Sequence, residues 1–310
     1  MRTLVTELTF LPLLVREVAR ADVVHVFSAS YNSFLLAALP PMLVARALGR
    51  PVVLNYHSGE AANHLKTSKI ARAALARVDR IVVPSRFLVD VFASFGLDTA
   101  VVPNVVDLER FRFRARERLQ PQLLSTRNFE PLYNVACTLR AFRLVQDRWP
   151  DATLTVVGGG SDERSLRRLA ADLALRHVRF AGRVSPDAIA ECYAAHDIYI
   201  QSPNIDNMPI SVLEAYASGL PVVSTEAGGM PAILTHGEHG LLAALNDHRA
   251  LAANVLALLD DPALARRVAR AGYDACRACT WATVRQQWLR VYRGVRSATA
   301  AQPAPAISHD

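Results

Sequence analysis

The chain has 310 residues, of which 51% are apolar and 20% are charged, a balance typical of a globular protein with one or two domains. Lysine and arginine total 35 against 28 acidic residues, so the net charge is +7, which suits an acidic partner such as a diphosphate. Nucleic acid is not an expected partner, because no basic stretch is interleaved with aromatic residues that could stack on bases.

The amino-terminal part indicates neither a secretion signal nor a membrane span. Glu7 and Glu17 stand on either side of a short apolar run that lacks a small-residue cleavage pattern. The longest apolar stretch, residues 34–45, is interrupted by Pro40 and Pro41 and falls short of the roughly 20 residues that cross a bilayer. We therefore expect a cytoplasmic protein, and contact with the inner face of the membrane stays open.

Short β-branched runs alternate with longer helical stretches along the chain, which predicts an α/β fold with parallel sheets. An arginine-rich stretch over residues 108–122 lacks apolar periodicity and is interpreted as a solvated linker between two domains. The strand-like ranges are 23–27, 52–56, 80–83 and 100–102 before this stretch, and 123–125, 153–157, 178–181, 198–201 and 222–225 after it.

The elements predict two doubly wound, Rossmann-like domains, residues 1–107 and 123–279. Beyond them, Trp281, Trp288 and Tyr292 recur at helical spacing with apolar neighbours and predict a closing helix over residues 280–296. Residues 297–310 are expected to form a disordered tail.

The four cysteines do not indicate a metal or redox site. Cys137 and Cys192 lie in apolar, helix-like contexts, and the pair Cys276 and Cys279 has no second ligand pair near it. We interpret all four as small apolar residues. No cluster of metal ligands is evident in the sequence, and no metal is expected.

Ligands of open α/β sheets bind beyond the carboxyl ends of the strands, so the loops after the strands are the candidate sites. Gly158, Gly159 and Gly160 follow one strand and precede a helix, where small residues would let a phosphate or sugar approach the backbone. A dinucleotide-binding dehydrogenase is disfavoured, because Glu163 stands where the third glycine of its fingerprint belongs.

A second loop, residues 202–209, leads into a helix that Pro209 is expected to begin. This start would leave free amides near Asn207 and Met208. Asp206 lies in the loop and Glu214 about one and a half turns into the helix, so two carboxylates could hold sugar hydroxyls there. The alternative is that Asp206 caps the loop and Glu214 is a solvated helix position.

A third glycine-bearing loop follows the strand at 222–225. Gly228 and Gly229 precede Met230 and Pro231, which open the next helix. Alone, this loop is interpreted as an ordinary tight turn between strand and helix.

The run EAYASGLPVVS at residues 214–224, followed by Gly228, Gly229 and GEHGLL at 237–242, resembles the retaining GT-B glycosyltransferases of the family 4 type. The stretch PNVVD at 103–107 resembles the family's hinge, and the resemblance extends over about residues 23–292. It implies a GT-B fold of two domains facing a cleft. Residues 1–107 would form the acceptor-side domain, and residues 123–279 the nucleotide-sugar-binding domain. The closing helix would pack back towards the first of these.

The resemblance also implies roles for individual residues. Asp206 and Glu214 occupy the ends of the family's Glu-x7-Glu motif, where the first carboxylate lies against the donor sugar and the second holds the ribose hydroxyls. Arg127 matches the arginine that grips the diphosphate, and His57 matches the histidine that reaches the donor sugar from the first domain. His57, Asp206 and Arg127 are therefore the expected catalytic residues. The expected donor-binding residues are Glu214, Asn207, Met208, Gly158, Gly159, Gly160 and Arg183.

The chain departs from the family pattern in three places. Asp206 is one methylene shorter than the usual glutamate, and Leu132 stands where a lysine is expected. The stretch Asp22-Val23-Val24-His25 comes within 25 residues of Met1, which predicts an incomplete N-terminal domain. Such a domain is expected to expose sheet edge and apolar faces and to self-associate.

The implied activity is metal-independent, retaining transfer of a sugar from a nucleotide diphosphate sugar, without a cofactor. The acceptor would be a sugar, a lipid-linked molecule or a small molecule. Two alternatives stay open: a catalytically weak nucleotide-sugar-binding module and a nucleotide-sugar epimerase. Six basic side chains between residues 66 and 86, called the basic set below, form either a solvated helix face or a contact for anionic lipid. Its members are Lys66, Lys69, Arg72, Arg77, Arg80 and Arg86.

Overall fold

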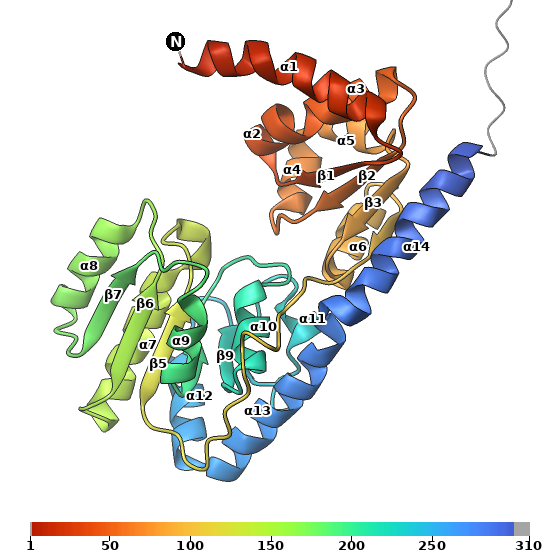
Figure 1. The fold of residues 1–310 in the computed structure, drawn as a ribbon. Coiled ribbons are helices and arrows are strands. Elements are labelled where there is room, and N and C mark those ends of the chain that lie inside the picture. Colours follow the sequence, from red (N-terminus) through yellow and green to blue (C-terminus); the bar gives the residue numbers. More distant parts are fainter. Residues whose placement is uncertain (1, 301–310) are drawn as a thin grey trace, which may run out of the picture. The chain divides into compact units, whose positions relative to one another are not determined.

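The computed structural model describes residues 2–300, and side chains are described for residues 10–297. The described chain contains two parallel sheets and separates into two compact units (Figure 1). Among the described residues, unit 1 comprises 2–102 and 285–300, and unit 2 comprises 103–284. The predicted α/β fold with parallel sheets is confirmed.

Unit 1 is built on a four-stranded sheet in the order β1-β2-β3-β4. The central strand β2 is buried at every position, because helices cover both faces of such a sheet. Two helices of unit 1 begin at a serine N-cap: Ser68 Oγ accepts a hydrogen bond from the Ala71 amide, and Ser85 Oγ accepts one from the Leu88 amide. The strands are β1 (Val24–Ser28), β2 (Val52–Tyr56), β3 (Arg80–Val83) and β4 (Thr99–Val101). The helices are α1 (Arg2–Arg20), α2 (Tyr31–Ser33), η1 (Phe34–Ala38), α3 (Leu39–Ala47), α4 (Ala61–Thr67), α5 (Lys69–Leu75) and α6 (Arg86–Ala93).

The last helix, α14 (Trp281–Ala300), contributes its residues from 285 onward to unit 1. Tyr292 Oη lies 2.7 Å from His25 Nδ1, and the Trp288 ring centroid lies 4.7 Å from that of His25. Of the three aromatic residues that predicted this helix, Trp288 and Tyr292 therefore pack against β1, whereas Trp281 is 59% exposed. The helix continues through residues 297–300, so the expectation of disorder there is wrong, and residues 301–310 lie outside the described residues.

Unit 2 is built on a six-stranded sheet in the order β10-β9-β8-β5-β6-β7. The chain leaves β5 towards β7 on one side and resumes with β8 on the other, so β5 and β8 flank a switch point. The strands are β5 (Gln122–Thr126), β6 (Thr153–Val157), β7 (Val178–Gly182), β8 (Ile198–Ile200), β9 (Val222–Thr225) and β10 (Leu241–Ala243). The helices are η2 (Pro131–Tyr133), α7 (Val135–Arg148), α8 (Glu163–Asp172), α9 (Ile189–Ala195), α10 (Ile210–Ala217), α11 (Met230–Ile233), α12 (His248–Asp260), α13 (Pro262–Cys276) and η3 (Arg277–Cys279).

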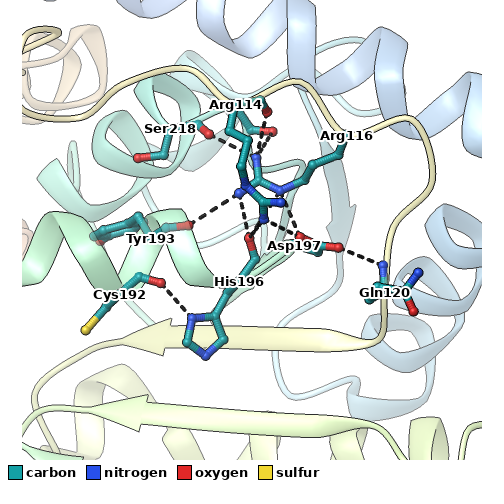
Figure 2. A network of polar contacts seen from close by, with 9 residues as sticks. Arg114, Arg116, Gln120, Cys192, Tyr193, His196, Asp197 and Ser218 are labelled. Carbon is teal, nitrogen blue, oxygen red and sulfur yellow. Dashed lines mark hydrogen bonds and ion pairs between the residues drawn. The ribbon is translucent and has the colours of Figure 1, made fainter.

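The arginine-rich segment 108–122 belongs to unit 2, and the interpretation of it as a solvated linker is wrong at Arg116. Figure 2 shows the Arg116 guanidinium, only 3% exposed, among backbone carbonyls and Asp197. Its Nε donates to Asp197 Oδ1 at 3.0 Å, and its Nη1 donates to the Ser218 carbonyl at 3.0 Å. Burial, with the nearby charge of Arg114, lowers the pKa of Arg116 to about 10 against the opposing effect of Asp197, so the side chain stays charged at neutral pH.

Cys137, Cys276 and Cys279 are buried, and Cys192 is partly buried. All four cysteines are free thiols. Burial raises the pKa of Cys276 to about 12 and that of Cys279 to about 11, which keeps them in the unreactive thiol form. Within the described part of the chain, no helix combines the length and the apolar character that crossing a membrane demands.

Candidate functional site

The candidate site lies in unit 2, where the loops after β5 and β8 are neighbours because their strands pair in parallel. Arg127 directly follows β5, Asp206 lies in the loop after β8, and Ser211 lies in the first turn of α10. Arg127 Nη2 donates to Asp206 Oδ2, and Nη1 donates to Ser211 Oγ at 3.1 Å. The ion pair is nearly buried, with side chains 9% and 12% exposed. Two residues expected to contact the same donor molecule therefore contact each other.

The Arg127 guanidinium is held as a cation in low-dielectric surroundings. Its carbon atom lies 4.1 Å from the centroid of the Tyr133 ring, a cation–π contact. Burial acts most strongly and lowers the pKa of Arg127, but the Asp206 carboxylate and the neighbouring Tyr199, Tyr133 and Tyr193 together outweigh burial and raise it. The buried Nε atom of Arg127 has no hydrogen-bond partner among the described residues, so one donor is left for a further acceptor.

The glycine loop after β6 lies against the Arg127 loop. A Cβ atom on Gly158 would stand 2.0 Å from the Arg127 carbonyl oxygen, and one on Gly160 would stand 2.4 Å from the Phe129 carbonyl oxygen. The Cβ side of these two glycines is therefore filled by the chain's own backbone, and their expected contact with a phosphate or sugar stays a prediction. Gly159 faces the Arg183 side chain, whose Nε would be 3.3 Å from an added Cβ.

Glu214 lies on α10 with its carboxylate at the edge of a buried hydroxyl cluster. Tyr193 Oη donates to Glu214 Oε2 at 2.8 Å. Burial raises the pKa of Glu214, and the hydrogen bond from Tyr193 opposes that rise. The alternative of a solvated helix position is wrong, because the Glu214 side chain is only partly exposed and is bonded from below.

The loop before α10 differs from its expected form. The helix begins at Ile210, and Pro209 is its cap residue rather than its first residue. The Asn207 amide, expected to be free, donates to Asp206 Oδ1 at 2.8 Å, while the Met208 carbonyl accepts from Asn104 Nδ2 at 2.7 Å. Asp206 therefore caps its own loop as well as pairing with Arg127.

The loop after β9 closes against the same backbone. The Gly229 amide donates to the Asp206 carbonyl at 2.9 Å, and a Cβ on Gly228 would lie 2.2 Å from that oxygen. The interpretation of Gly228 and Gly229 as residues of a tight turn agrees with this contact, and the turn fixes the position of the Asp206 backbone.

His57 belongs to unit 1, directly after β2, and its neighbours there are aromatic. Its ring centroid lies 5.6 Å from that of Phe27, and its buried Nε2 has no hydrogen-bond partner among the described residues. Burial, together with the nearby His25, lowers the pKa of His57, so its imidazole is neutral at physiological pH. A neutral ring can accept or donate a hydrogen bond at Nε2.

Three residues of the site were missed from the sequence: Tyr133, Tyr193 and Ser211. Ser211 lies three residues before Glu214 on one helix, so helical spacing alone could have indicated that it faces the same side. The two tyrosines carry no such signal. Their importance follows from the packing of α9 and η2 beside β5 and β8.

Residues 108–275 match the family model described as glycosyl transferases group 1, and residues 2–110 match that of glycosyltransferase family 4. The phosphatidyl-myo-inositol mannosyltransferase of Mycobacterium leprae is 33% identical over 209 residues, covering 65% of this chain and 55% of that protein. A GDP-mannose-dependent alpha-(1-6)-phosphatidylinositol monomannoside mannosyltransferase of Mycolicibacterium smegmatis is 31% identical over 288 residues, covering 85% of this chain and 72% of that protein. The chain thus spans little more than half the length of the mannosyltransferase from M. leprae.

Solved structures show the same fold. HepE of Anabaena in complex with UDP-glucose superposes with a TM-score of 0.79 at 18% identity, covering 92% of this chain and 82% of that one. Sucrose-phosphate synthase from Thermosynechococcus elongatus superposes with a TM-score of 0.74 at 22% identity, covering 89% of this chain and 74% of that one. At these identities the likeness concerns the fold alone.

Proposed function

The chain belongs to the group 1, family 4 glycosyltransferases, whose fold is GT-B, and we propose that it transfers a sugar from a nucleotide diphosphate sugar with retention of configuration. The observation that carries the proposal is the convergence of Arg127, Asp206 and Glu214 at the carboxyl ends of β5 and β8. A cation for the diphosphate and two carboxylates for hydroxyl groups stand at the switch point of one sheet.

Arg127 is proposed to neutralise the diphosphate as the bond to the sugar breaks. A buried, preorganised guanidinium stabilises developing negative charge strongly, because water competes poorly for it. Asp206 and His57 would contact the donor sugar. The acceptor would attack the face from which the diphosphate departs, and the leaving group would take the acceptor proton. No step of this scheme requires a metal ion.

The residues Asn207, Met208, Gly158, Gly159, Gly160 and Arg183 are proposed to surround the donor. Gly158 would also act indirectly, because it lets the Arg127 backbone approach, and Gly160 does the same for the Phe129 backbone. Arg183 lies over Gly159, and its charge lies near the Glu130 carboxylate, whose pKa is lowered mainly by hydrogen bonds from Ser161. Arg183 is our candidate for the cation that replaces the lysine expected at Leu132.

The names of the relatives indicate which substrates to test first. Two of them are mannosyltransferases acting on phosphatidylinositol or its mannoside, and one of these is GDP-mannose-dependent. A glycogen synthase of Mycobacterium tuberculosis is 28% identical over 305 residues, so glucosyl donors belong in the same panel. We place GDP-mannose with a phosphatidylinositol acceptor first.

A lipid-linked acceptor would bring the chain to a membrane, and we propose peripheral contact through unit 1. Large apolar side chains are exposed on α1 and α3, among them Phe10, Leu11 and Leu43. The basic set contributes less than its number indicates, because Arg72 donates to the backbone of α4 and Arg80 pairs with Asp98 at 2.7 Å. Sedimentation with phosphatidylserine vesicles, but not with phosphatidylcholine vesicles, is the expected result, and equal sedimentation with both would contradict charge-assisted contact.

The decisive experiment is mass spectrometry of the chain with UDP-, GDP- and ADP-sugars, each with and without lipid and sugar acceptors. Acceptor-dependent formation of a glycosylated product is expected. Conversion of the donor to an isomeric sugar without acceptor would instead show an epimerase, and tight binding without any turnover would show a binding module. Glu214→Gln is the matched control variant. It keeps the shape of the side chain but removes the negative charge proposed to hold the ribose, so product formation should fall.

Arg127→Lys tests the cation directly. A single ammonium cannot reproduce a planar guanidinium that contacts Asp206, Ser211 and Tyr133 together. We expect transfer to fall by about 10²-fold or more, as for loss of one preorganised donor to a developing anion. Near-normal transfer by this variant would show that another group neutralises the diphosphate.

A further inference from the structure

A cluster of buried hydroxyl groups lies beneath Glu214, between α9, β8 and α10. Tyr193 and Tyr199 are both fully buried, and their rings stack with centroids 5.9 Å apart. Thr126 Oγ1 lies 2.7 Å from Tyr193 Oη and 3.3 Å from Tyr199 Oη. The two tyrosines are thus near-equivalent in burial and in their contact with Thr126.

They differ in what else their hydroxyl groups reach. Tyr199 Oη donates to Gln201 Oε1 at 3.3 Å and also forms a hydrogen bond with the Ser211 side chain, but it has no hydrogen bond with Glu214. Tyr193 Oη lies 2.8 Å from Glu214 Oε2 and 3.3 Å from the Ser211 carbonyl. Because a phenol has one proton and a carboxylate is the stronger acceptor, the Tyr193 proton goes to Glu214, and Thr126 can donate to the Tyr193 oxygen.

This bond fixes one oxygen of the carboxylate and leaves the other available. Within residues 10–297, Glu214 Oε1 has no hydrogen-bond partner. The hydrogen bond from Tyr193 to Oε2 therefore fixes the orientation of the carboxylate plane, while Oε1 can accept a hydrogen bond from a bound molecule. An unanchored glutamate would lose rotamer freedom on binding a diol, and the anchor removes part of that cost in advance.

Tyr193 is itself held in place at both ends. The edge of its ring meets Phe111, with centroids 5.5 Å apart. Its carbonyl accepts from Arg116 Nη2 at 3.4 Å, in the network of Figure 2. Arg116 therefore holds the backbone of Tyr193 in place, and Tyr193 in turn orients Glu214.

We propose that Tyr193 is a positioning residue that orients the Glu214 carboxylate so that Oε1 receives the ribose hydroxyls of the donor nucleotide. The inference rests on the proposed function, since it assumes that Glu214 holds the ribose. It adds a residue outside the motif, on a different helix, that determines how well the chain selects ribonucleotides.

The test compares Tyr193→Phe with Tyr199→Phe, which removes an equally buried hydroxyl that does not contact Glu214. Calorimetry with UDP, GDP and ADP identifies the tightest nucleotide, and its 2′-deoxy and 3′-deoxy counterparts are then titrated. We expect Tyr193→Phe to weaken binding of the ribonucleotide by roughly 5- to 10-fold, within the net range of one ordinary hydrogen bond, because the lost bond acts on the ribose only through the carboxylate. Binding of the deoxynucleotide that loses the Glu214 contact should change far less, and Tyr199→Phe should leave the discrimination intact.

The pH dependence of affinity supplies a readout that packing alone would not move. Three titratable or charged groups lie near the Glu214 carboxylate. Tyr193 on α9 donates a hydrogen bond to it, while Tyr199 on β8 and Arg110 in the segment before β5 interact with it only through their charge. Burial raises the Glu214 pKa and the Tyr193 bond lowers it, so loss of the hydroxyl raises it further. Since the ionised carboxylate binds the hydroxyls better, the acid limb of affinity against pH should move to higher pH in Tyr193→Phe and stay in place in Tyr199→Phe.

The outcomes separate the two hypotheses. If Tyr193→Phe weakens ribo- and deoxynucleotides equally, or if Glu214→Gln with Tyr193→Phe loses more affinity than Glu214→Gln alone, Tyr193 acts through packing and the inference is overturned. If Glu214→Gln binds nucleotide like the unmodified chain, the assignment of Glu214 to the ribose fails first. Should Tyr193→Phe not fold, Thr126→Val removes the donor to Tyr193 and should give the same pattern at smaller amplitude.

Discussion

Replacement of Arg116 by methionine should destabilise unit 2 more than any comparable change in the arginine-rich segment. The guanidinium donates to Asp197 and to the carbonyls of Arg114, Ser218, Gly219 and His196, the last at 2.6 Å. Methionine fills similar volume but leaves several of these buried acceptors unpaired. Breaking a buried charged network of this kind costs about 3–5 kcal/mol.

Arg114→Met is the matched control for this prediction. Arg114 bonds the same carboxylate at 2.5 Å, but its side chain is 46% exposed, so we expect a loss of about 1 kcal/mol or less. Urea unfolding followed by circular dichroism measures both variants, and hydrogen exchange of unit 2 amides shows whether the loss is local. Losses that agree within about 0.5 kcal/mol would refute the reasoning, because burial would then not decide the cost.

Two further predictions concern a glycine and the histidines. Gly158→Ala should weaken nucleotide binding and destabilise unit 2, because the new Cβ would stand 2.0 Å from the Arg127 carbonyl oxygen. Gly96→Ala is the control: it has open space around it and should cost only about 1–2 kcal/mol of left-handed backbone strain. Equal melting temperatures for the two variants would contradict this prediction. Burial lowers the pKa of His25, His57 and His64 below the ordinary value of 6.5, so the unfolded chain binds more protons there. The stability that these neutral histidines contribute is therefore present above about pH 6.5 and is lost as the pH falls below it. Amide hydrogens of unit 1 should exchange faster at pH 5.5 than at pH 7.5, after correction for intrinsic exchange rates. Equal protection at the two pH values would contradict this prediction.

Much of the fold could be predicted because burial dictates composition in a parallel sheet. The range 52–56 is apolar apart from Asn55, the range 153–157 is apolar or β-branched throughout, and both are strands with these bounds. The strand β10 (Leu241–Ala243) was missed, because three residues without a β-branched side chain give no periodic signal. The Arg116 segment was misread for a related reason: hydrogen bonds to carbonyls hold it, and apolar periodicity does not report them.

The candidate site could be predicted residue by residue but not as an arrangement. Asp206 and Glu214 were found because they lie eight positions apart on one loop and helix. That Asp206 bonds to Arg127, 79 positions away, follows from the pairing of β5 with β8, which the sequence does not express. Likewise, the role of Gly158 follows from how closely its loop approaches the loop of Arg127. The spacing of residues along the sequence gives no information on that distance.

The Arg127–Asp206 pair leads to a prediction that separates binding from transfer. In the chain without nucleotide, the cation proposed for the diphosphate is already neutralised by a carboxylate that is itself nearly buried. A bound diphosphate must therefore share Arg127 with Asp206 and approach a like charge. Asp206→Asn keeps the shape and removes both penalties, so nucleoside diphosphate should bind tighter by about 5- to 10-fold, or about 1 kcal/mol.

The same change should lower transfer, because the contact of Asp206 with the donor sugar is lost where the sugar reacts. Calorimetry with UDP and GDP, alongside product formation by mass spectrometry, measures the two effects on one preparation. Asp260→Asn serves as a control, because that carboxylate pairs with Arg148 on the surface at 3.0 Å. Weaker nucleotide binding by Asp206→Asn would mean that the carboxylate positions Arg127 for the diphosphate more than it competes with it. Opposite changes in affinity and transfer would instead show that this chain keeps a carboxylate at 206 for the sugar, at the expense of holding the nucleotide.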